Sequence, residues 1–168
     1  MKKRIFKILS ILLLILTMNI NSQPIYKDKQ MTIFNLTTED KDQLQYLRNE
    51  AIKFIREKTK KEIKEPVSIE TLQTAINLSN KNTNQVILYG FGVLIGDYFI
   101  EKHKMKWLAV EDEYGKDLVI FVEKTLYYVG TITLISKRIE NNEKIDVKYL
   151  ISQIEKHKSE NIKEYKTY

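Results

Sequence analysis

The sequence contains no cysteine. This absence excludes disulfide bonds, zinc sites built from thiolates and the lipid-modified cysteine of a bacterial lipoprotein. The stability of the fold must therefore come from packing. After residue 22 the chain also lacks a long uninterrupted apolar run, whereas a transmembrane helix needs roughly 20 apolar residues. We therefore expect a soluble product.

Histidine is scarce as well, with only His103 and His157 in the chain. They are too far apart for a His-x-x-x-His zinc motif, and neither stands beside a plausible nucleophile. Ser136 lacks the G-x-S-x-G setting of a hydrolase, and residues 90–96 have the wrong spacing for a dinucleotide-binding loop. We expect no catalytic residue, no metal site and no cofactor. At the predicted end of a helix, a protonated His103 would complement the helix dipole.

The first 22 residues of the chain have the three-part order of a secretory signal peptide. A basic start precedes the apolar run 8–16, and the small residue Ser22 suits the position before a cleavage site. The apolar run is too short for a permanent anchor. We therefore expect cleavage before Gln23, no transmembrane anchor afterwards, and a bacterial periplasmic or secreted protein.

Charge and size restrict the partners and the architecture. The whole chain carries a formal charge of +6, but four of its basic residues and none of its acidic ones lie in the predicted signal peptide. The processed protein is then nearly balanced in charge, which argues against a nucleic-acid partner. Residues 23–168 have the usual size of one domain with one core.

Helical patterns dominate the first half of this remainder. Residues 23–36 are expected to form a partly ordered arm. Thr37 or Thr38 can cap a helix whose apolar residues recur every three or four positions over 44–55. A second helix over 68–78 can be capped by its first residue, a serine.

The segment 85–100 is the most apolar part of the remainder, and its length favours a buried central helix over a strand. Gly92 and Gly96 lie four residues apart, and therefore on one face of that helix. Their missing side chains would allow a neighbouring element to approach closely.

Strand patterns follow. Residues 107–110 and 118–122 should pair as a hairpin, with Gly115 supplying the positive φ of a tight reversal. Residues 126–135 suggest a third strand followed by a helical turn, and Asp146 can cap a last amphipathic helix. The sequence thus predicts an α+β fold: helices on a small antiparallel sheet of two or three strands, in a single domain over 37–158 with a charged tail over 159–168.

One family resemblance rests on the predicted hairpin. The sequence WLAVEDEYGKDL over 107–118, with a glycine-containing helix before it and SKRIE after it, resembles a bacterial family known as domain of unknown function 3806. The resemblance covers about 85–156 and implies the architecture but no reaction. The chain departs from the family pattern by lacking a proline after the second strand. The most specific matches are Trp107, Asp112, Glu113, Tyr114 and Gly115, with Lys137 and Arg138 as a secondary match.

Two groups of carboxylates have both a chemical and a structural interpretation. Glu111, Asp112, Glu113 and Asp117 offer hard oxygens for Ca²⁺, but their spacing does not match a calcium loop, which favours a turn in which Asp112 accepts backbone N–H bonds. A second pair, four apart on the central helix, is better explained as a solvated helix end than as an acid and base. That pair is Asp97 and Glu101.

The aromatic residues divide between core and surface. We expect Trp107 and Phe121 to lie in the core. Tyr114 and one of Tyr127 and Tyr128 are the best candidates for exposed anchors that bind another protein.

Three functions therefore stay open. The first is a non-enzymatic, exported module that binds another envelope or secreted protein, as an inhibitor or immunity-type factor would. The second is an envelope-acting hydrolase that uses Asp97, Glu101 or the acidic turn. The third is a structural periplasmic domain with a small ligand. The missing catalytic constellation favours the first, and an enzyme would require Glu101, His103, Asp112 and Glu113 to converge on one pocket.

Overall fold

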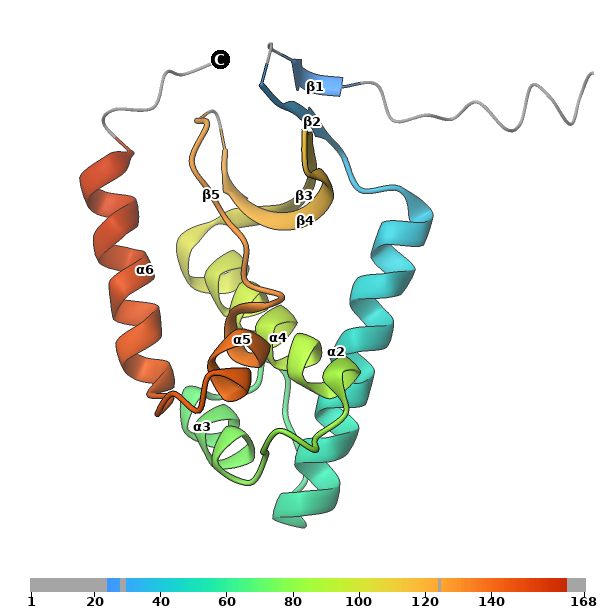
Figure 1. Cartoon of the computed structure of the whole chain (residues 1–168), viewed down its shortest axis with the longest axis vertical. Coiled ribbons are helices and arrows are strands. Elements are labelled where there is room, and N and C mark those ends of the chain that lie inside the picture. Colours follow the sequence, from blue (N-terminus) through green and yellow to red (C-terminus); the bar gives the residue numbers. More distant parts are fainter. Residues whose placement is uncertain (1–23, 28–29, 124, 163–168) are drawn as a thin grey trace, which may run out of the picture.

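The computed structural model describes residues 24–27, 30–123 and 125–162, so the predicted signal peptide lies outside the described part of the chain. Within these residues the chain forms an α+β fold with five helices and a five-stranded antiparallel sheet. The sheet lies at one end of the molecule and most helices at the other (Figure 1). In chain order the elements are β1 (Pro24–Lys27), β2 (Thr32–Phe34), α2 (Thr38–Thr59), α3 (Ile69–Asn77), α4 (Gln85–His103), β3 (Met105–Asp112), β4 (Gly115–Val122), β5 (Tyr128–Val129), α5 (Leu134–Glu140) and α6 (Val147–Asn161).

The helix starts follow the local signals in the sequence. The Thr37 hydroxyl accepts a hydrogen bond from the Asp40 N–H, and the Asp40 carboxylate accepts one from the Thr37 N–H, which completes a capping box. The side chains of Ser68 and Asp146 cap α3 and α6 by accepting a hydrogen bond from the backbone N–H three residues later. The three predicted helix starts are therefore confirmed. α6 continues to Asn161, into the segment that was expected to be tail.

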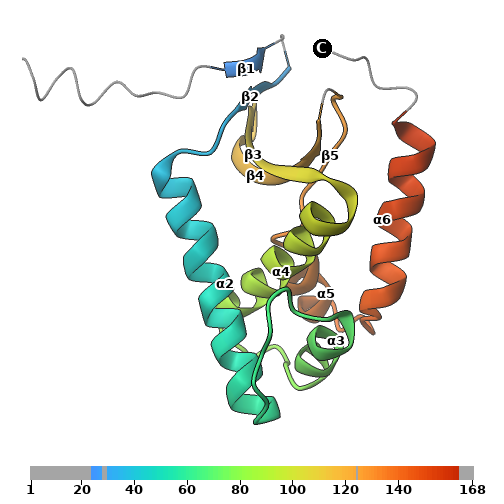
Figure 2. The same ribbon diagram turned by 180° about the vertical axis from the view of Figure 1, so that it is seen from behind.

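The central helix α4 is also confirmed, and α2 and α6 run along opposite sides of the molecule with α4 between them (Figure 2). Its glycines permit the close approach that their spacing predicted. A Cβ on Gly92 would lie 2.2 Å from the Thr131 carbonyl oxygen, and a Cβ on Gly96 would lie 2.3 Å from the Trp107 ring. Larger residues at these two positions would push α4 away from the sheet and from the chain that follows β5.

The sheet is larger than the predicted two or three strands. Its order is β1-β2-β3-β4-β5, and the segment expected to be an arm supplies β1 and β2. β2 pairs with β3, placing Ile33 opposite Val110, and Ile33 is completely buried. A strand of three residues is too short to show an alternating pattern, so only its pairing with a distant strand reveals it.

Both faces of the sheet are apolar. One face packs on the helices through Met105, Ile120 and the partly buried Trp107. The opposite face has its own small core of Ile33, Leu108, Val110, Val119 and Phe121. The prediction for Phe121 is confirmed in full, whereas Trp107 packs at the edge of the main core.

No helix among the described residues combines the length and the apolar character required to cross a membrane.

Candidate functional site

The tip of the β3–β4 hairpin has the local structure that the sequence predicted. The Asp112 carboxylate accepts a hydrogen bond of 2.8 Å from the Tyr114 N–H, and Gly115 has a φ of +122°. The turn therefore holds Asp112 close to its own backbone and directs Tyr114 outward. The Tyr114 side chain is 90% exposed, the highest value among the large hydrophobic residues of the described chain.

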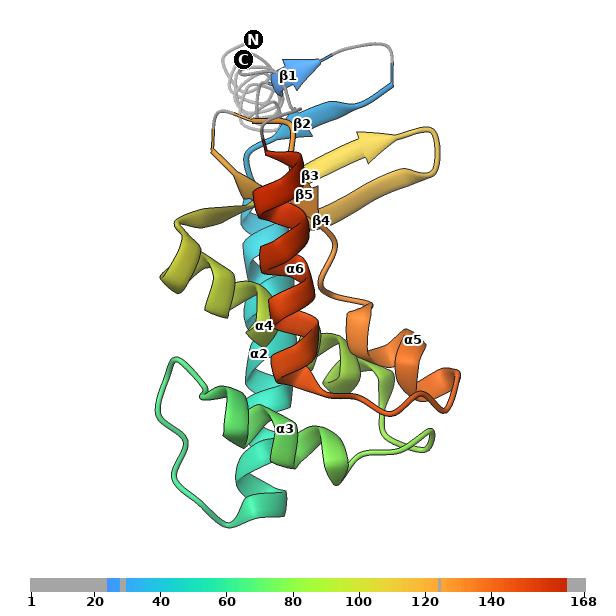
Figure 3. The same cartoon turned by 90° about the vertical axis from the view of Figure 1, so that its left-hand side faces the viewer.

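A groove of about 810 Å³ lies beside this tip. Figure 3 shows the β1–β2 and β3–β4 hairpins projecting in the same direction, and the groove is lined by residues from both, with one further residue from β5. The described residues that line it are Gln30, Met31, Thr32, Glu111, Asp112, Glu113, Tyr114 and Tyr128.

The lining is acidic and aromatic. Glu111, Asp112 and Glu113 are exposed, and within the described part of the chain no lysine or arginine lies within ion-pair distance of them. Tyr128 is 39% exposed and stacks on Phe121, with 5.9 Å between ring centroids. Three carboxylates beside two accessible phenol rings can attract a cationic group and bind its apolar portion. Among the described residues no cluster of histidines and carboxylates has the geometry to hold a metal ion.

The structure resolves the alternative between the two neighbouring tyrosines. Tyr127 is 1% exposed and lies in the main core, whereas Tyr128 reaches the groove. Tyr114 and Tyr128, both surface candidates in the sequence, therefore meet at one site.

Asp97 was expected at a solvated helix end, but the structure places it in a shielded ion pair. Its carboxylate accepts hydrogen bonds from Arg48 Nε at 2.6 Å and Nη2 at 2.8 Å, and from the Trp107 indole N–H at 3.0 Å. The side chains of Arg48 and Asp97 are only 18% and 23% exposed. The ion pair raises the pKa of Arg48. Nothing in the local sequence indicates the role of Arg48, because its partner Asp97 is on another helix.

Glu101, by contrast, is exposed and contacts Lys102, as a solvated residue would. The carboxylates of the predicted pair thus have different environments. Asp97 joins α2, α4 and β3, whereas Glu101 remains at the surface.

Both histidines have partners that the sequence did not indicate. His103 Nε2 lies 2.9 Å from a Glu155 carboxylate oxygen, and His157 Nδ1 lies 3.2 Å from the Tyr127 hydroxyl. Because Glu155 and His157 are both on α6, the two contacts hold the second half of that helix against the body of the domain. His157 thus contacts a residue of the main core, and the helix dipole is only part of the setting of His103.

The four residues that an enzyme would need in one pocket do not converge. Glu101 and His103 lie at the end of α4, immediately before β3 begins, while Asp112 and Glu113 lie at its far end. A strand of eight residues separates the two pairs by roughly 25 Å. A shared reaction centre is therefore geometrically excluded for this set.

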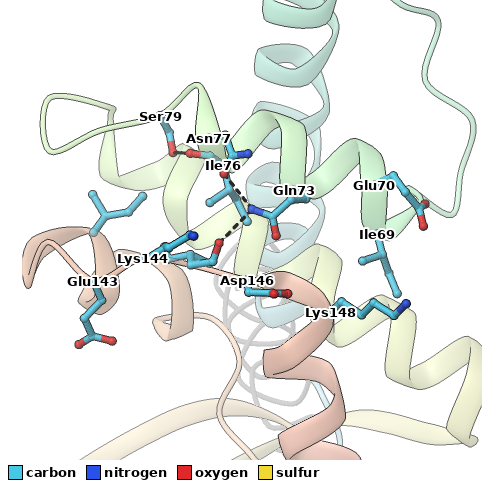
Figure 4. A pocket seen from close by; sticks show the side chains of 12 residues that line it. Ile69, Glu70, Gln73, Ile76, Asn77, Ser79, Glu143, Lys144, Asp146 and Lys148 are labelled. Carbon is cyan, nitrogen blue, oxygen red and sulfur yellow. Dashed lines mark hydrogen bonds between the residues drawn. The ribbon is translucent and has the colours of Figure 1, made fainter.

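A second hollow, of about 660 Å³, lies between α3 and the connection from α5 to α6 (Figure 4). The Gln73 side chain spans it: its amide N–H groups donate to the Asn77 side chain and the Ile145 carbonyl, and its oxygen accepts from the Val147 N–H. Both halves of the Gln73 amide are thus used in joining α3 to the start of α6, which is a structural role.

Asp40 connects the hairpin to α2. Burial by itself would raise the pKa of Asp40, but hydrogen bonds from Lys116 and Thr37 outweigh that effect and hold the pKa below its ordinary value. Lys116 Nζ lies 2.6 Å from one Asp40 carboxylate oxygen and 2.9 Å from the other. Lys116 lies two residues after Tyr114, so this ion pair joins the tip end of the hairpin to the first turn of α2.

These features define a small α+β module with an acidic, aromatic groove at the hairpin end of its sheet. Residues 68–150 match the family model described as Domain of unknown function (DUF3806), so this part of the chain is a DUF3806 domain. The resemblance seen around Trp107 is thereby confirmed. The match begins at the cap of α3 and ends within α6, so β1, β2 and α2 precede it.

The structure is also similar to the crystal structure, at 1.50 Å resolution, of a protein from Bacteroides thetaiotaomicron VPI-5482. The TM-score is 0.66 at 10% sequence identity, and the similarity covers 78% of this chain and 49% of that one. This chain thus corresponds to about half the length of that protein, and the likeness concerns the fold alone. No curated protein matches the chain significantly in sequence.

Proposed function

We propose that this chain is an exported, non-enzymatic module that binds another envelope or secreted protein through the groove at the hairpin tip. The observation that carries the proposal is the 90% exposure of Tyr114 within an acidic lining. A large aromatic side chain held outward by a rigid turn loses little conformational entropy on binding, and such residues supply much of the affinity at protein interfaces.

The lining also suggests the charge of the partner. Glu111, Asp112 and Glu113 repel acidic surfaces and attract basic ones, so a partner with exposed lysine or arginine is favoured. This charge complementarity would chiefly increase the association rate, and it should weaken at high salt. An inhibitor or immunity-type role in the envelope would use such a contact.

Export is the part of the proposal that depends on residues 1–22, whose basic, apolar and small residues follow the order of a signal peptide. The intact mass of the protein recovered from the periplasm or the medium tests it. We expect the mass of a chain that begins at Gln23. The mass of a chain that still contains Met1 would contradict export.

Site-specific photocrosslinking tests the binding surface. A photoreactive phenylalanine analogue at Tyr114 should give a discrete protein adduct in the native host, and the adduct should weaken when Glu111 and Glu113 are replaced by glutamine. Tyr149 is the matched control, because it is also an exposed tyrosine, at 60%, but lies on α6. The same adduct from both positions, or none from Tyr114, would contradict this surface.

A further inference from the structure

One edge of the sheet is left unpaired in the described structure. β4 pairs with β3 over its whole length, but β5 covers only Ile120 and Phe121 on the other side. After β5 the chain turns away toward α5 (Figure 1). The outer edge of β4 from Gly115 to Leu118 therefore has no neighbouring strand among the described residues.

The register shows which backbone groups point outward along this edge. The Val122 N–H donates to the Tyr127 carbonyl, so the backbone of Val122 faces the β5 side. Alternate residues of a strand direct their N–H and C=O to the same side. The N–H and C=O groups of Leu118 and Lys116 consequently face the open edge.

A cleft of about 230 Å³ lies next to these groups. It is bounded by the β4 edge on one side and by the chain from Gly130 to Thr133 on the other, with apolar side chains at its base. Asp40 and Gln43 of α2 also line it, and the Asp40 carboxylate is paired with Lys116. A Cβ on Gly130 would meet no atom within 4 Å, so the entrance is open there. The side chains at the base are Leu47, Tyr89, Leu118 and Ile132.

We infer that this edge accepts an extended segment of a partner polypeptide as an additional strand, beside β4 and in line with β5. Two outward N–H groups and two outward C=O groups provide the main-chain hydrogen bonds of β-strand addition. The side chains of the added strand that lie opposite Leu118 and Lys116 would enter the cleft, and its apolar base suits valine, leucine or isoleucine.

The other face of the added strand would lie beside acidic side chains. Asp117 is exposed, and because it stands between Lys116 and Leu118 in β4, its side chain lies on the opposite face of the sheet from theirs, close to the acidic residues of the hairpin tip. An added residue opposite Asp117 is therefore favoured when it is basic. The segment that fits this edge alternates apolar and basic residues.

This inference goes beyond the proposed function, because the edge is a different surface from the groove at Tyr114. The probe that tests it is a pentapeptide of alternating lysine and valine, capped at both ends, titrated into the protein. Binding should slow hydrogen exchange at the Lys116 and Leu118 amides. The Asp117 amide is the internal reference, because it faces β3 and should already exchange slowly.

Two further peptides separate strand addition from simple charge attraction. N-methylation of the valines removes the N–H groups that face β4 and should weaken binding about tenfold or more, whereas N-methylation of the lysines should change it less than about twofold. Equal losses from both peptides would overturn the inference.

Three protein variants complete the test. Gly130→Trp fills the open entrance and should abolish binding without unfolding the protein, and Asp117→Lys should weaken it more than the equally charged Glu57→Lys on α2. Tyr114→Ala should leave peptide binding unchanged, so the edge and the groove can fail independently. A stable dimer that forms without peptide and protects the same two amides would overturn the partner segment in favour of a second copy of the chain.

Discussion

Asp97 and the carboxylates of the hairpin tip have the same chemistry but opposite surroundings. Asp97 accepts three hydrogen bonds from Arg48 and Trp107 and is mostly shielded from water. Glu111 and Glu113 are exposed and have no basic partner in the described chain. A carboxylate whose acceptors are occupied by its own protein holds the fold together, whereas one with free acceptors can bind something else.

The largest expected effect is a loss of stability when Trp107, which donates a hydrogen bond to Asp97, is replaced. Trp107→Ala should lower the free energy of unfolding by about 3 kcal/mol, because it removes partly buried apolar area and leaves a cavity against Gly96. Trp107→Phe keeps a ring but loses the N–H bond to Asp97, and should cost about 1 kcal/mol. Urea unfolding of both variants measures the difference, and equal stability of Trp107→Ala and the parent protein would contradict the proposed packing.

The next effect concerns the ion pair itself. Asp97→Ala should cost about 2 kcal/mol, because Arg48 and the Trp107 N–H lose their acceptor in a shielded position. A double-mutant cycle with Arg48→Met should show positive coupling, since the second substitution removes the unpaired charge that the first creates. Additive losses would mean that the pair does not act as a unit.

A smaller effect, dependent on pH, belongs to the ion pair between Asp40 and Lys116 near the tip of the hairpin. The pKa of Asp40 is lowered in the folded protein, so the carboxylate stabilises the fold fully above its unfolded pKa of about 3.9. That stabilisation is lost as the pH falls through the folded pKa. The stability advantage of the parent over Asp40→Asn should therefore shrink between about pH 5 and pH 2. A difference that does not change with pH would contradict the contribution of the ionised form.

The smallest effect on stability is expected at the tip. Tyr114→Ala should change the free energy of unfolding by less than about 0.5 kcal/mol, because the side chain is 90% exposed. The same substitution should weaken the proposed partner contact, so stability and binding separate at this residue. A large loss of stability would assign Tyr114 to the structural group with Trp107.

The features that could be predicted from the sequence are those held by hydrogen bonds between residues close together in the chain. The caps at Thr37 and Ser68 and the turn at Asp112 bond to residues two or three positions away. Such bonds depend on local sequence, and the predicted elements that contain them are confirmed. The position of Tyr114 at an exposed tip follows from the same local turn.

The polar contacts between elements could not be predicted in this way. Arg48 and Asp97 are 49 residues apart, and His103 and Glu155 are 52 apart. A charged residue on a helix looks the same in sequence whether it faces water or a distant partner. β1 and β2 were missed for a related reason, because strands of four and three residues show too little alternation to be recognised before they pair.

Asp40 makes one local contact, which could be predicted from the sequence, and one distant contact, which could not. Its place in the capping box depends on Thr37, three residues away, whereas its ion pair with Lys116 spans 76 residues. The order of the helices, the central hairpin and the exposed aromatic tip could be predicted from the sequence, because hydrogen bonds and apolar spacing within a few residues specify them. The pairing of the carboxylates, the groove formed by the tip with β2 and β5, and the open edge of β4 became visible in the folded chain alone, because they depend on the packing of distant segments.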